Sequence, residues 1–252
     1  MIGVFDSGVG GLTVLRALRE RLPSADIVYF GDTKNAPYGT RSREELTELT
    51  IAGFKLLQEH GAERIVSACN SVSASLAVSL FDALSIAPQA LIEMVGPTVA
   101  YFKGSTARLV LCATPATISS EIYQNAFRMI GKDIECVAIK ELAGAIERGA
   151  EEQEIERIIR EAFVQVSLKK DDILILACTH YPLALAAFQK VLGDVPLFDP
   201  ASVVADRARR QFWPQEAGDS TLRFLISKDS ETFRALAKQL FAGEKYSLEV
   251  LT

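Results

Sequence analysis

The sequence predicts an α/β protein with two pseudosymmetric domains, each built on an open parallel sheet. Short apolar runs alternate along the chain with longer segments of helical period, the pattern of repeated strand–helix units with right-handed crossovers. The runs are mostly continuously apolar, as expected of strands covered on both faces. Nine or so strands would make a single open sheet large, and 252 residues accommodate two domains of about 100–150 residues each.

The expected strands are short, and each is drawn mainly from Ile, Val, Leu, Phe and Ala. They are residues 2–5, 27–30, 65–68, 91–95, 109–113, 134–138, 173–177, 195–198 and 222–226. The segments between them have amphipathic patterns typical of helices. The leucines of 12–22 recur every three or four residues, and the apolar residues of 155–166 do the same opposite a face of Glu and Arg. A further helix is expected at 231–241.

The chain also repeats itself weakly. Residues 64–71 and 173–180 each contain an apolar strand, an Ala-Cys pair and two polar residues, at a shift of 109 residues. Residues 2–7 and 109–114 match at a shift of 107. Two matches at nearly equal shifts suggest duplicated domains, although buried strands also resemble one another because they draw on few residue types. By this pattern the first domain ends near 95–97 and the second near 199–200, and the segment after them could belong to either.

The composition excludes several classes of protein. A net charge of −5 and a pI near 5.3 make a nucleic-acid partner a poor expectation. Four scattered cysteines are too few for a disulfide framework, and two histidines exclude a histidine-rich metal site. The apolar runs are too short to span a membrane, and we see no signal segment, so a cytoplasmic location with no membrane partner is expected.

Polar residues follow several expected strands, where open parallel sheets bind ligands. They are Asp6, Ser7, Asp32, Cys69, Asn70, Ser71, Thr114, Thr117, Cys178, Thr179 and His180. A lone cysteine at a strand end is most often structural, and Cys112 and Cys136 fit that interpretation. Cys69 and Cys178 differ because each lies beside the start of an expected helix, where backbone N–H groups and the helix dipole favour a thiolate.

Two opposed thiols suit one reaction in particular. If the two halves are related by a pseudo-twofold axis, Cys69 and Cys178 face each other across a cleft. One thiolate then removes a proton from a carbon acid, and the other thiol protonates the opposite face to form the mirror image. Fixed donors must stabilise the developing charge, and Ser7, Asn70, Ser71, Thr179 and backbone amides are candidates to hold carboxylates. His180 is a candidate to tune a thiol pKa.

Two loops allow both a structural and a functional interpretation. Residues 6–12 carry three glycines but match neither a dinucleotide loop nor a P-loop, so they are either a tight turn or a nest of N–H groups for a carboxylate. The Pro-Tyr-Gly at 37–39 is either a plain turn or a loop whose Tyr38 closes over a ligand.

These motifs, in this order and spacing, resemble those of bacterial glutamate racemases, in the aspartate/glutamate racemase family. The resemblance rests on GVFDSGVGGLTV at 3–14, YFGDT at 29–33, PYGTRS at 37–42, ACNS at 68–71 and CTHYPL at 178–183. It implies an isomerase with two pseudosymmetric α/β domains and its active site in the cleft between them. It also implies that the C-terminal segment rejoins the first domain, which gives domains of 1–96 plus 205–252 and of 97–204.

The resemblance further implies a cofactor-independent interconversion of L- and D-glutamate that supplies D-glutamate for peptidoglycan. Cys69 would deprotonate D-glutamate and Cys178 would deprotonate L-glutamate, with Asp6 and His180 assisting. The substrate contacts implied are Asp6, Ser7, Tyr38, Gly39, Asn70, Ser71, Thr179 and His180. Glu147 matches an assisting glutamate only loosely, Ser71 stands where threonine is usual, and 94–98 lacks the usual Glu-Pro-Gly. Some members of the family have an N-terminal extension linked to activation by a cell-wall precursor; this sequence starts almost at its first expected strand, so we expect no such control.

Other functions remain open from the residues alone. The chemistry also suits racemisation of aspartate, or hydrolysis through one nucleophilic cysteine with His180 as base. The glycine loop keeps open a binding module without turnover. We expect no metal and no cofactor. Pyridoxal phosphate in particular is disfavoured, because no lysine stands out within a phosphate cradle. The expected partner is the small-molecule substrate, and the oligomeric state stays open, with a homodimer as one candidate.

Overall fold

A computed structural model describes residues 1–73, 76, 84–212 and 218–251. Its first sheet has six parallel strands in the spatial order β10-β9-β2-β1-β3-β4. The strands are β1 (Ile2–Asp6), β2 (Ile27–Gly31), β3 (Arg64–Ser67), β4 (Leu91–Ile92), β9 (Leu222–Ile226) and β10 (Ser247–Val250). The second sheet has four parallel strands in the order β6-β5-β7-β8. They are β5 (Leu109–Ala113), β6 (Glu135–Ala138), β7 (Ile173–Ala177) and β8 (Leu197–Phe198).

The two sheets share one topology. The order β2-β1-β3-β4 in the first sheet is matched by β6-β5-β7-β8 in the second. The sequence repeat follows this correspondence, since residues 2–7 and 109–114 contain β1 and β5, and residues 64–71 and 173–180 contain β3 and β7. The prediction of two pseudosymmetric parallel-sheet domains is therefore confirmed.

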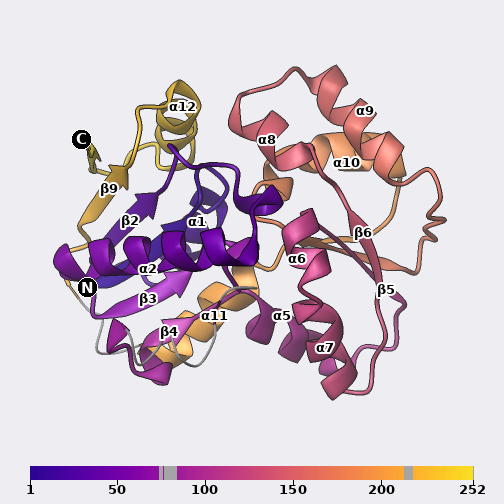
Figure 1. Ribbon diagram of the computed structural model, residues 1–252, viewed down its shortest axis with the longest axis horizontal. Coiled ribbons are helices and arrows are strands. Elements are labelled where there is room, and N and C mark those ends of the chain that lie inside the picture. Colours follow the sequence, from indigo (N-terminus) through magenta and orange to yellow (C-terminus); the bar gives the residue numbers. More distant parts are fainter. Residues whose placement is uncertain (74–75, 77–83, 213–217, 252) are drawn as a thin grey trace.

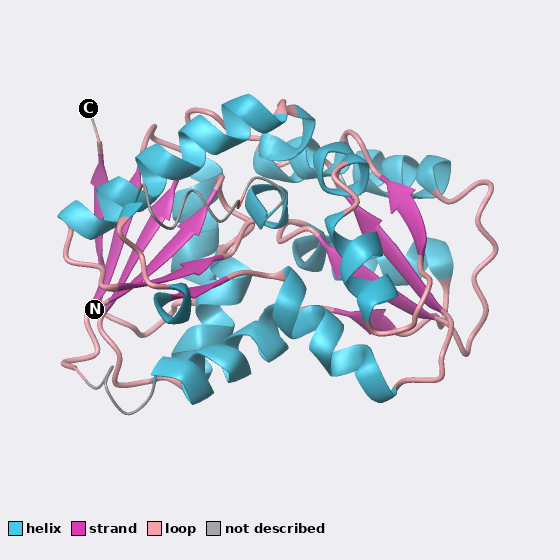
Figure 2. Cartoon of the chain, turned by 60° about the horizontal axis from the view of Figure 1, so that its bottom comes forward, coloured by secondary structure: helices cyan, strands magenta, loops and turns pink. Residues whose placement is uncertain are grey.

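Helices cover the faces of both sheets, which lie at opposite ends of the long axis (Figures 1 and 2). The helices of eight or more residues are α1 (Leu12–Arg21), α2 (Arg43–Glu59), α7 (Ile122–Met129), α9 (Glu152–Ala162), α10 (Leu185–Leu192), α11 (Ala201–Phe212) and α12 (Glu231–Leu240). Shorter ones are α3 (Asn70–Ser73), α5 (Val95–Tyr101), α6 (Pro115–Ser119) and α8 (Leu142–Glu147). Helix α2 begins with a capping box, in which Ser42 and Glu45 each bind the other's backbone N–H.

Burial of apolar side chains on both faces of each sheet holds this arrangement together. One core packs α1, α11 and α12 against one face of the first sheet, and a second packs α2 against the other. Two more cores cover the faces of the second sheet. Both sheets are thus sandwiched, which explains their continuously apolar strands.

The structure corrects the sequence prediction at three places. The expected strand at 195–198 is limited to β8 (Leu197–Phe198). The expected strand at 91–95 is limited to β4, because the Glu93 carboxylate accepts hydrogen bonds from the N–H groups of Val95 and Gly96 at 2.5 and 2.6 Å and so starts α5. Strand β10 was missed, since its apolar residues alternate with exposed ones at the sheet edge. Strands β9 and β10 both join the first sheet, while the domain boundaries at 96/97 and 204/205 remain our prediction.

Candidate active site

An enclosed cavity lies between the carboxyl ends of the two sheets. Its walls are Ser7, Pro37, Tyr38, Gly39, Cys69, Asn70, Ser71, Thr114, Ala143, Cys178, Thr179 and His180. Cys69 follows β3 of the first sheet and Cys178 follows β7 of the second, so the two thiols line one cavity from opposite sides. The free space inside is about 10 Å³, which is room for about one water molecule.

Cys69 is a buried thiol with a hydroxyl beside it. Its side chain is 5% exposed, and its Sγ lies 3.9 Å from the Ser7 Oγ, to which it donates. Burial raises the pKa of the Cys69 thiol to about 12, and the nearby Asp6 carboxylate adds to the rise. In this closed state the thiol form of Cys69 is therefore favoured.

Cys178 belongs to a chain of three groups. Its Sγ lies 3.8 Å from His180 Nδ1, and His180 Nε2 lies 2.6 Å from Glu147 Oε2. Burial by itself lowers the pKa of His180, but its hydrogen bonds to Cys178 and Glu147 reverse this and hold the pKa well above the ordinary value. The arrangement therefore favours a protonated imidazole between a sulfur and a carboxylate.

Asp6 lies beneath the cavity rather than on its wall. It is fully buried, and its carboxylate accepts hydrogen bonds from the Gly8 N–H at 2.9 Å and the Thr179 hydroxyl at 3.0 Å. Burial raises the pKa of Asp6, and the charge of His180 opposes the rise. Asp6 thus joins the first sheet to the second through Thr179, close enough to both Cys69 and His180 to influence their charges.

The glycine loop does bind a carboxylate, but that carboxylate belongs to the protein. The N–H of Val9 donates to Glu147 Oε2 at 3.1 Å. A Cβ atom at Gly8 would collide with the same carboxylate, and one at Gly10 would collide with Thr179 and His180. Glycine is needed here because the loop approaches the second sheet so closely. Glu147, matched only loosely from sequence, is placed by α8 at the centre of this contact.

Tyr38 does not present a free phenol to the cavity. Its hydroxyl donates to Asp32 Oδ2 at 2.6 Å, and the side chain is 1% exposed. Asp32 also accepts from Asn35 and from the Ser227 hydroxyl, which fixes the loop that carries Tyr38. Gly39 lies against Thr114 of the second domain, where a Cβ would collide.

Hydroxyl groups meet on the remaining wall. The Ser71 Oγ lies 2.9 Å from Thr114 Oγ1, which lies 3.1 Å from Thr117 Oγ1. Tyr123 donates to Asn70 Oδ1 at 2.6 Å and so orients that amide. All the residues predicted for the site meet here except that Asp6 lies below the wall. Sequence analysis missed Tyr123, which lies inside a helix and not at a strand end, so no local signal marks it.

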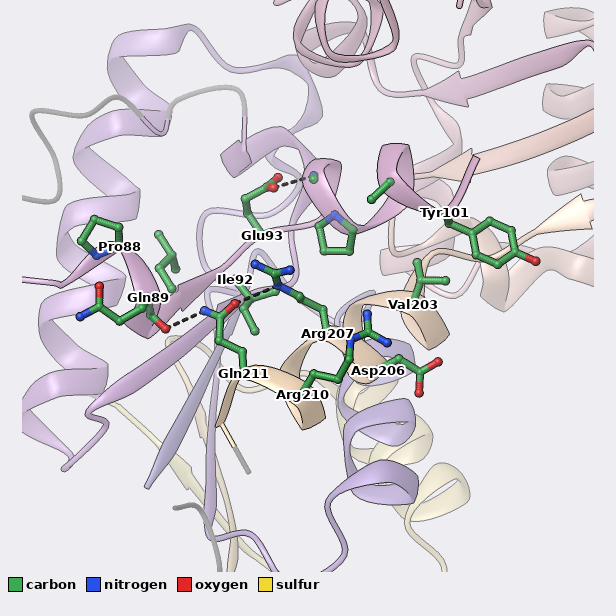
Figure 3. Close-up of a pocket in the computed structure, with 14 residues that line it drawn as sticks. Pro88, Gln89, Ile92, Glu93, Tyr101, Val203, Asp206, Arg207, Arg210 and Gln211 are labelled. Carbon is green, nitrogen blue, oxygen red and sulfur yellow. Dashed lines mark hydrogen bonds between the residues drawn. The ribbon is translucent and has the colours of Figure 1, made fainter. Parts of the chain in front are cut away.

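A larger pocket of about 970 Å³ lies away from the thiols, between β4, α5 and α11 (Figure 3). Arg207 and Arg210 of α11 face it with Tyr101 and Glu93. It contains no cysteine or histidine, so the chemistry expected from the sequence does not occur there.

Within the described ranges, no three His, Cys, Asp or Glu side chains group closely enough to hold a metal ion. A search of the same residues finds no helix of the length and hydropathy that a membrane crossing demands.

Fold and cavity together define an α/β enzyme with a thiol on each of two facing parallel-sheet domains. The family profile described as Asp/Glu/Hydantoin racemase matches residues 12–208. A glutamate racemase of Aquifex pyrophilus is 34% identical over 249 residues, which cover 99% of this chain and 96% of that protein. The crystal structure of glutamate racemase isoform RacE1 from Bacillus anthracis superposes with a TM-score of 0.87 at 29% identity, covering 100% of this chain and 97% of that one.

A second solved structure, glutamate racemase from Francisella tularensis in complex with D-glutamate, superposes with a TM-score of 0.86 at 29% identity, over 100% of this chain and 97% of that one. The chain belongs to the Asp/Glu/hydantoin racemase family. The prediction that it is an isomerase of the racemase class is confirmed.

Proposed function

We propose that this protein interconverts L- and D-glutamate without a cofactor, by proton transfer between two cysteines. The observation that carries the proposal is that Cys69 and Cys178, from different sheets, line one enclosed cavity. The relatives described above are named as glutamate racemases, and one of them was solved with D-glutamate. Both facts support glutamate as the substrate.

In the proposed reaction each thiol works on one face of the α-carbon. With L-glutamate, the Cys178 thiolate takes the α-proton, and the electron pair of that C–H bond passes into the α-carboxylate. The Cys69 thiol then gives its proton to the opposite face, forming D-glutamate and leaving Cys69 as thiolate. The reverse reaction begins from Cys69. The high pKa of Cys69 in the closed cavity suits the proton donor, and the imidazole of His180, whose pKa is raised, lies 3.8 Å from the sulfur of Cys178.

The polar wall is suited to bind both carboxylates of glutamate. Ser7, Asn70 and Thr179 line the cavity, and each can donate to a carboxylate oxygen. Ser71 keeps the hydroxyl of the usual threonine and places it beside Thr114. An α-proton is very weakly acidic, so fixed donors that meet the charge as it develops contribute most of the rate enhancement.

A second candidate function has its own support in the Cys178–His180–Glu147 chain. A thiol, an imidazole and a carboxylate in sequence also form the apparatus of a cysteine hydrolase. That reaction acylates Cys178 and does not need Cys69. The position of Cys69 on the opposite wall favours racemisation over hydrolysis.

Measuring proton exchange in deuterated buffer distinguishes racemisation from hydrolysis. Native protein should convert L-glutamate to D-glutamate and place deuterium at the α-carbon. Cys69→Ser and Cys178→Ser should each lose racemisation by about 10²–10⁴-fold, the usual contribution of a general acid or base. Cys136→Ser, in a strand away from the cavity, is the matched control and should keep full activity. Full racemisation by Cys69→Ser would overturn the two-thiol mechanism.

The cellular role follows from the substrate. A glutamate racemase supplies D-glutamate for peptidoglycan, and we place this role in the cytoplasm. Loss of the gene product should create a requirement for D-glutamate in a bacterium that lacks another source, and growth without it would contradict the assignment.

A further inference from the structure

The enclosed cavity is too small to admit an amino acid in this conformation. It holds about one water molecule, and apart from Pro37 its walls are buried side chains and glycine. A substrate can therefore reach the thiols only if part of the wall moves. The position of a second, open pocket indicates which part.

A pocket of about 750 Å³, here called the outer pocket, lies next to the cavity. Its lining is Thr33, Ala36, Pro37, Thr40, Lys140, Glu141, Gly144, Glu147, Arg148, Lys228, Asp229, Ser230 and Thr232. Pro37 lines both spaces, and Glu147 is hydrogen-bonded to His180 of the cavity wall. The partition between the two spaces is therefore one side chain thick.

The partition is made by helix α8 and the loop that contains Pro37. Ala143 of α8 faces the cavity, whereas the next residue, Gly144, faces the outer pocket. A Cβ atom at Gly144 would lie 3.6 Å from Pro37 Cγ, so glycine leaves a thin contact between the two domains at this point. A small shift of α8 against Pro37 would open a passage to the thiols.

The outer pocket carries two lysines without an ion-pair partner among the described residues. Lys140 follows β6 of the second sheet, and Lys228 follows β9 of the first. The other charged side chains are mostly paired: Arg148 with Glu154, Asp229 with Arg234, and Glu147 with His180. The lining as a whole has three cationic and three anionic side chains, and once each paired group is counted with its partner, the two lysines and Glu141 leave one positive charge. The two lysines come from different sheets.

We propose that the outer pocket is the entrance to the active site, and that Lys140 and Lys228 draw carboxylate substrates to the partition formed by Pro37 and Gly144. This proposal rests on the cavity being the reaction site. Charged walls at the mouth of a cleft raise the local concentration of an oppositely charged ligand, and the effect weakens as salt is added.

Alkylation of the cavity thiols tests the entrance without depending on racemase activity. Iodoacetate and iodoacetamide differ mainly in charge, and mass spectrometry of peptides gives their rates at Cys69 and Cys178. In the double variant Lys140→Glu/Lys228→Glu, the iodoacetate-to-iodoacetamide ratio at both cavity cysteines should fall about tenfold at low salt. At about 0.5 M salt, where charges are screened, the ratio in the variant should be closer to that of native protein. Cys136, which is partly exposed and does not line the cavity, shows by comparison how far the variant changes the reactivity of a thiol outside the cavity.

A matched control removes the effect of net charge. The double variant Lys55→Glu/Lys103→Glu makes the same change at exposed positions outside the outer pocket and should leave the ratio unchanged. Gly144→Ile should slow both reagents to a similar extent, because a branched side chain fills the gap at Pro37. The proposal that the outer pocket is the entrance would be overturned by an unchanged iodoacetate-to-iodoacetamide ratio in Lys140→Glu/Lys228→Glu, or by unchanged alkylation rates in Gly144→Ile.

Glutamate kinetics then separate this inference from the proposed function. If the protein racemises glutamate, the Lys140→Glu/Lys228→Glu variant should have a raised KM and a kcat within about twofold of native protein. If glutamate does not turn over in native protein, the proposed function fails, while the alkylation ratios still support or overturn the entrance.

Discussion

Replacing Glu147 with glutamine tests how strongly the carboxylate on α8 supports the thiol of Cys178. Glu147 Oε2 lies 2.6 Å from His180 Nε2 and accepts from the Val9 N–H at 3.1 Å. The side chains of Glu147 and His180 are 14% and 3% exposed. Glutamine keeps the size and one acceptor oxygen but removes the negative charge, so the change isolates the electrostatic part of the contact.

The size of the effect follows from the burial of this pair. A hydrogen bond to a charged group contributes about 1.5–3 kcal/mol, and slight exposure of Glu147 places the value near ~2 kcal/mol. At about 1.4 kcal/mol per factor of ten, kcat/KM should fall about thirtyfold. The fall should be equal for the two enantiomers, because the equilibrium constant of a racemisation is one. The pKa of His180 should also fall, which moves the corresponding limb of the pH–rate profile to lower pH.

Circular dichroism of glutamate, started from each enantiomer, measures kcat/KM directly. Glu151→Gln is the matched control: it removes a carboxylate just before α9, from an exposed side chain that lines neither the cavity nor the outer pocket, and should change kcat/KM less than twofold. A Glu147→Gln protein that folds normally and keeps kcat/KM within threefold of native would refute the idea that this charge supports His180.

Three further outcomes follow from the structure. Tyr123→Phe should raise KM about fivefold with a smaller change in kcat, because Asn70 loses the hydrogen bond that orients its amide; an unchanged KM would contradict this. The pKa of His180 is raised in the folded protein, so its charged form stabilises the fold fully below about pH 6.5 and less as the pH rises through the folded-state pKa. The melting temperature of native protein, relative to that of His180→Gln, should therefore decline from pH 6 towards alkaline pH. A difference that stays constant with pH would argue against a charged imidazole. Ser42→Ala removes the α2 capping box and should cost about 1 kcal/mol, or roughly 2–4 °C in melting temperature, without changing kcat; calorimetry measures the first and the racemase assay the second.

Most of the fold was readable because buried parallel strands are chemically distinctive. Runs such as 173–177 are apolar on both faces, because the sheet that contains them is covered by helices on both sides. The predictions were wrong where a strand departs from that rule. Strand β10 is an edge strand with alternate residues exposed, and the 91–95 run is interrupted because the Glu93 carboxylate caps a helix within it.

The candidate site residues were found by their place at strand ends, where parallel sheets gather polar groups. Their partners were not predictable in the same way. The glycine loop was expected to bind a carboxylate, yet which carboxylate is decided by α8, more than a hundred residues later. Tyr38 similarly carries a phenol that suits a ligand, but Asp32 and the folded loop engage it instead.

By itself, the sequence determined that this protein has two parallel sheets, and that in each sheet one strand is followed by a cysteine and then by hydrogen-bonding residues. These are local properties, set by burial along single strands and by residue order at their ends. Only the tertiary structure decided that Cys69 and Cys178 share one cavity, that Glu147 supports His180, and that the cavity is closed. Those features depend on how two domains pack against each other, and contacts between residues distant in sequence leave no local pattern from which they could be inferred.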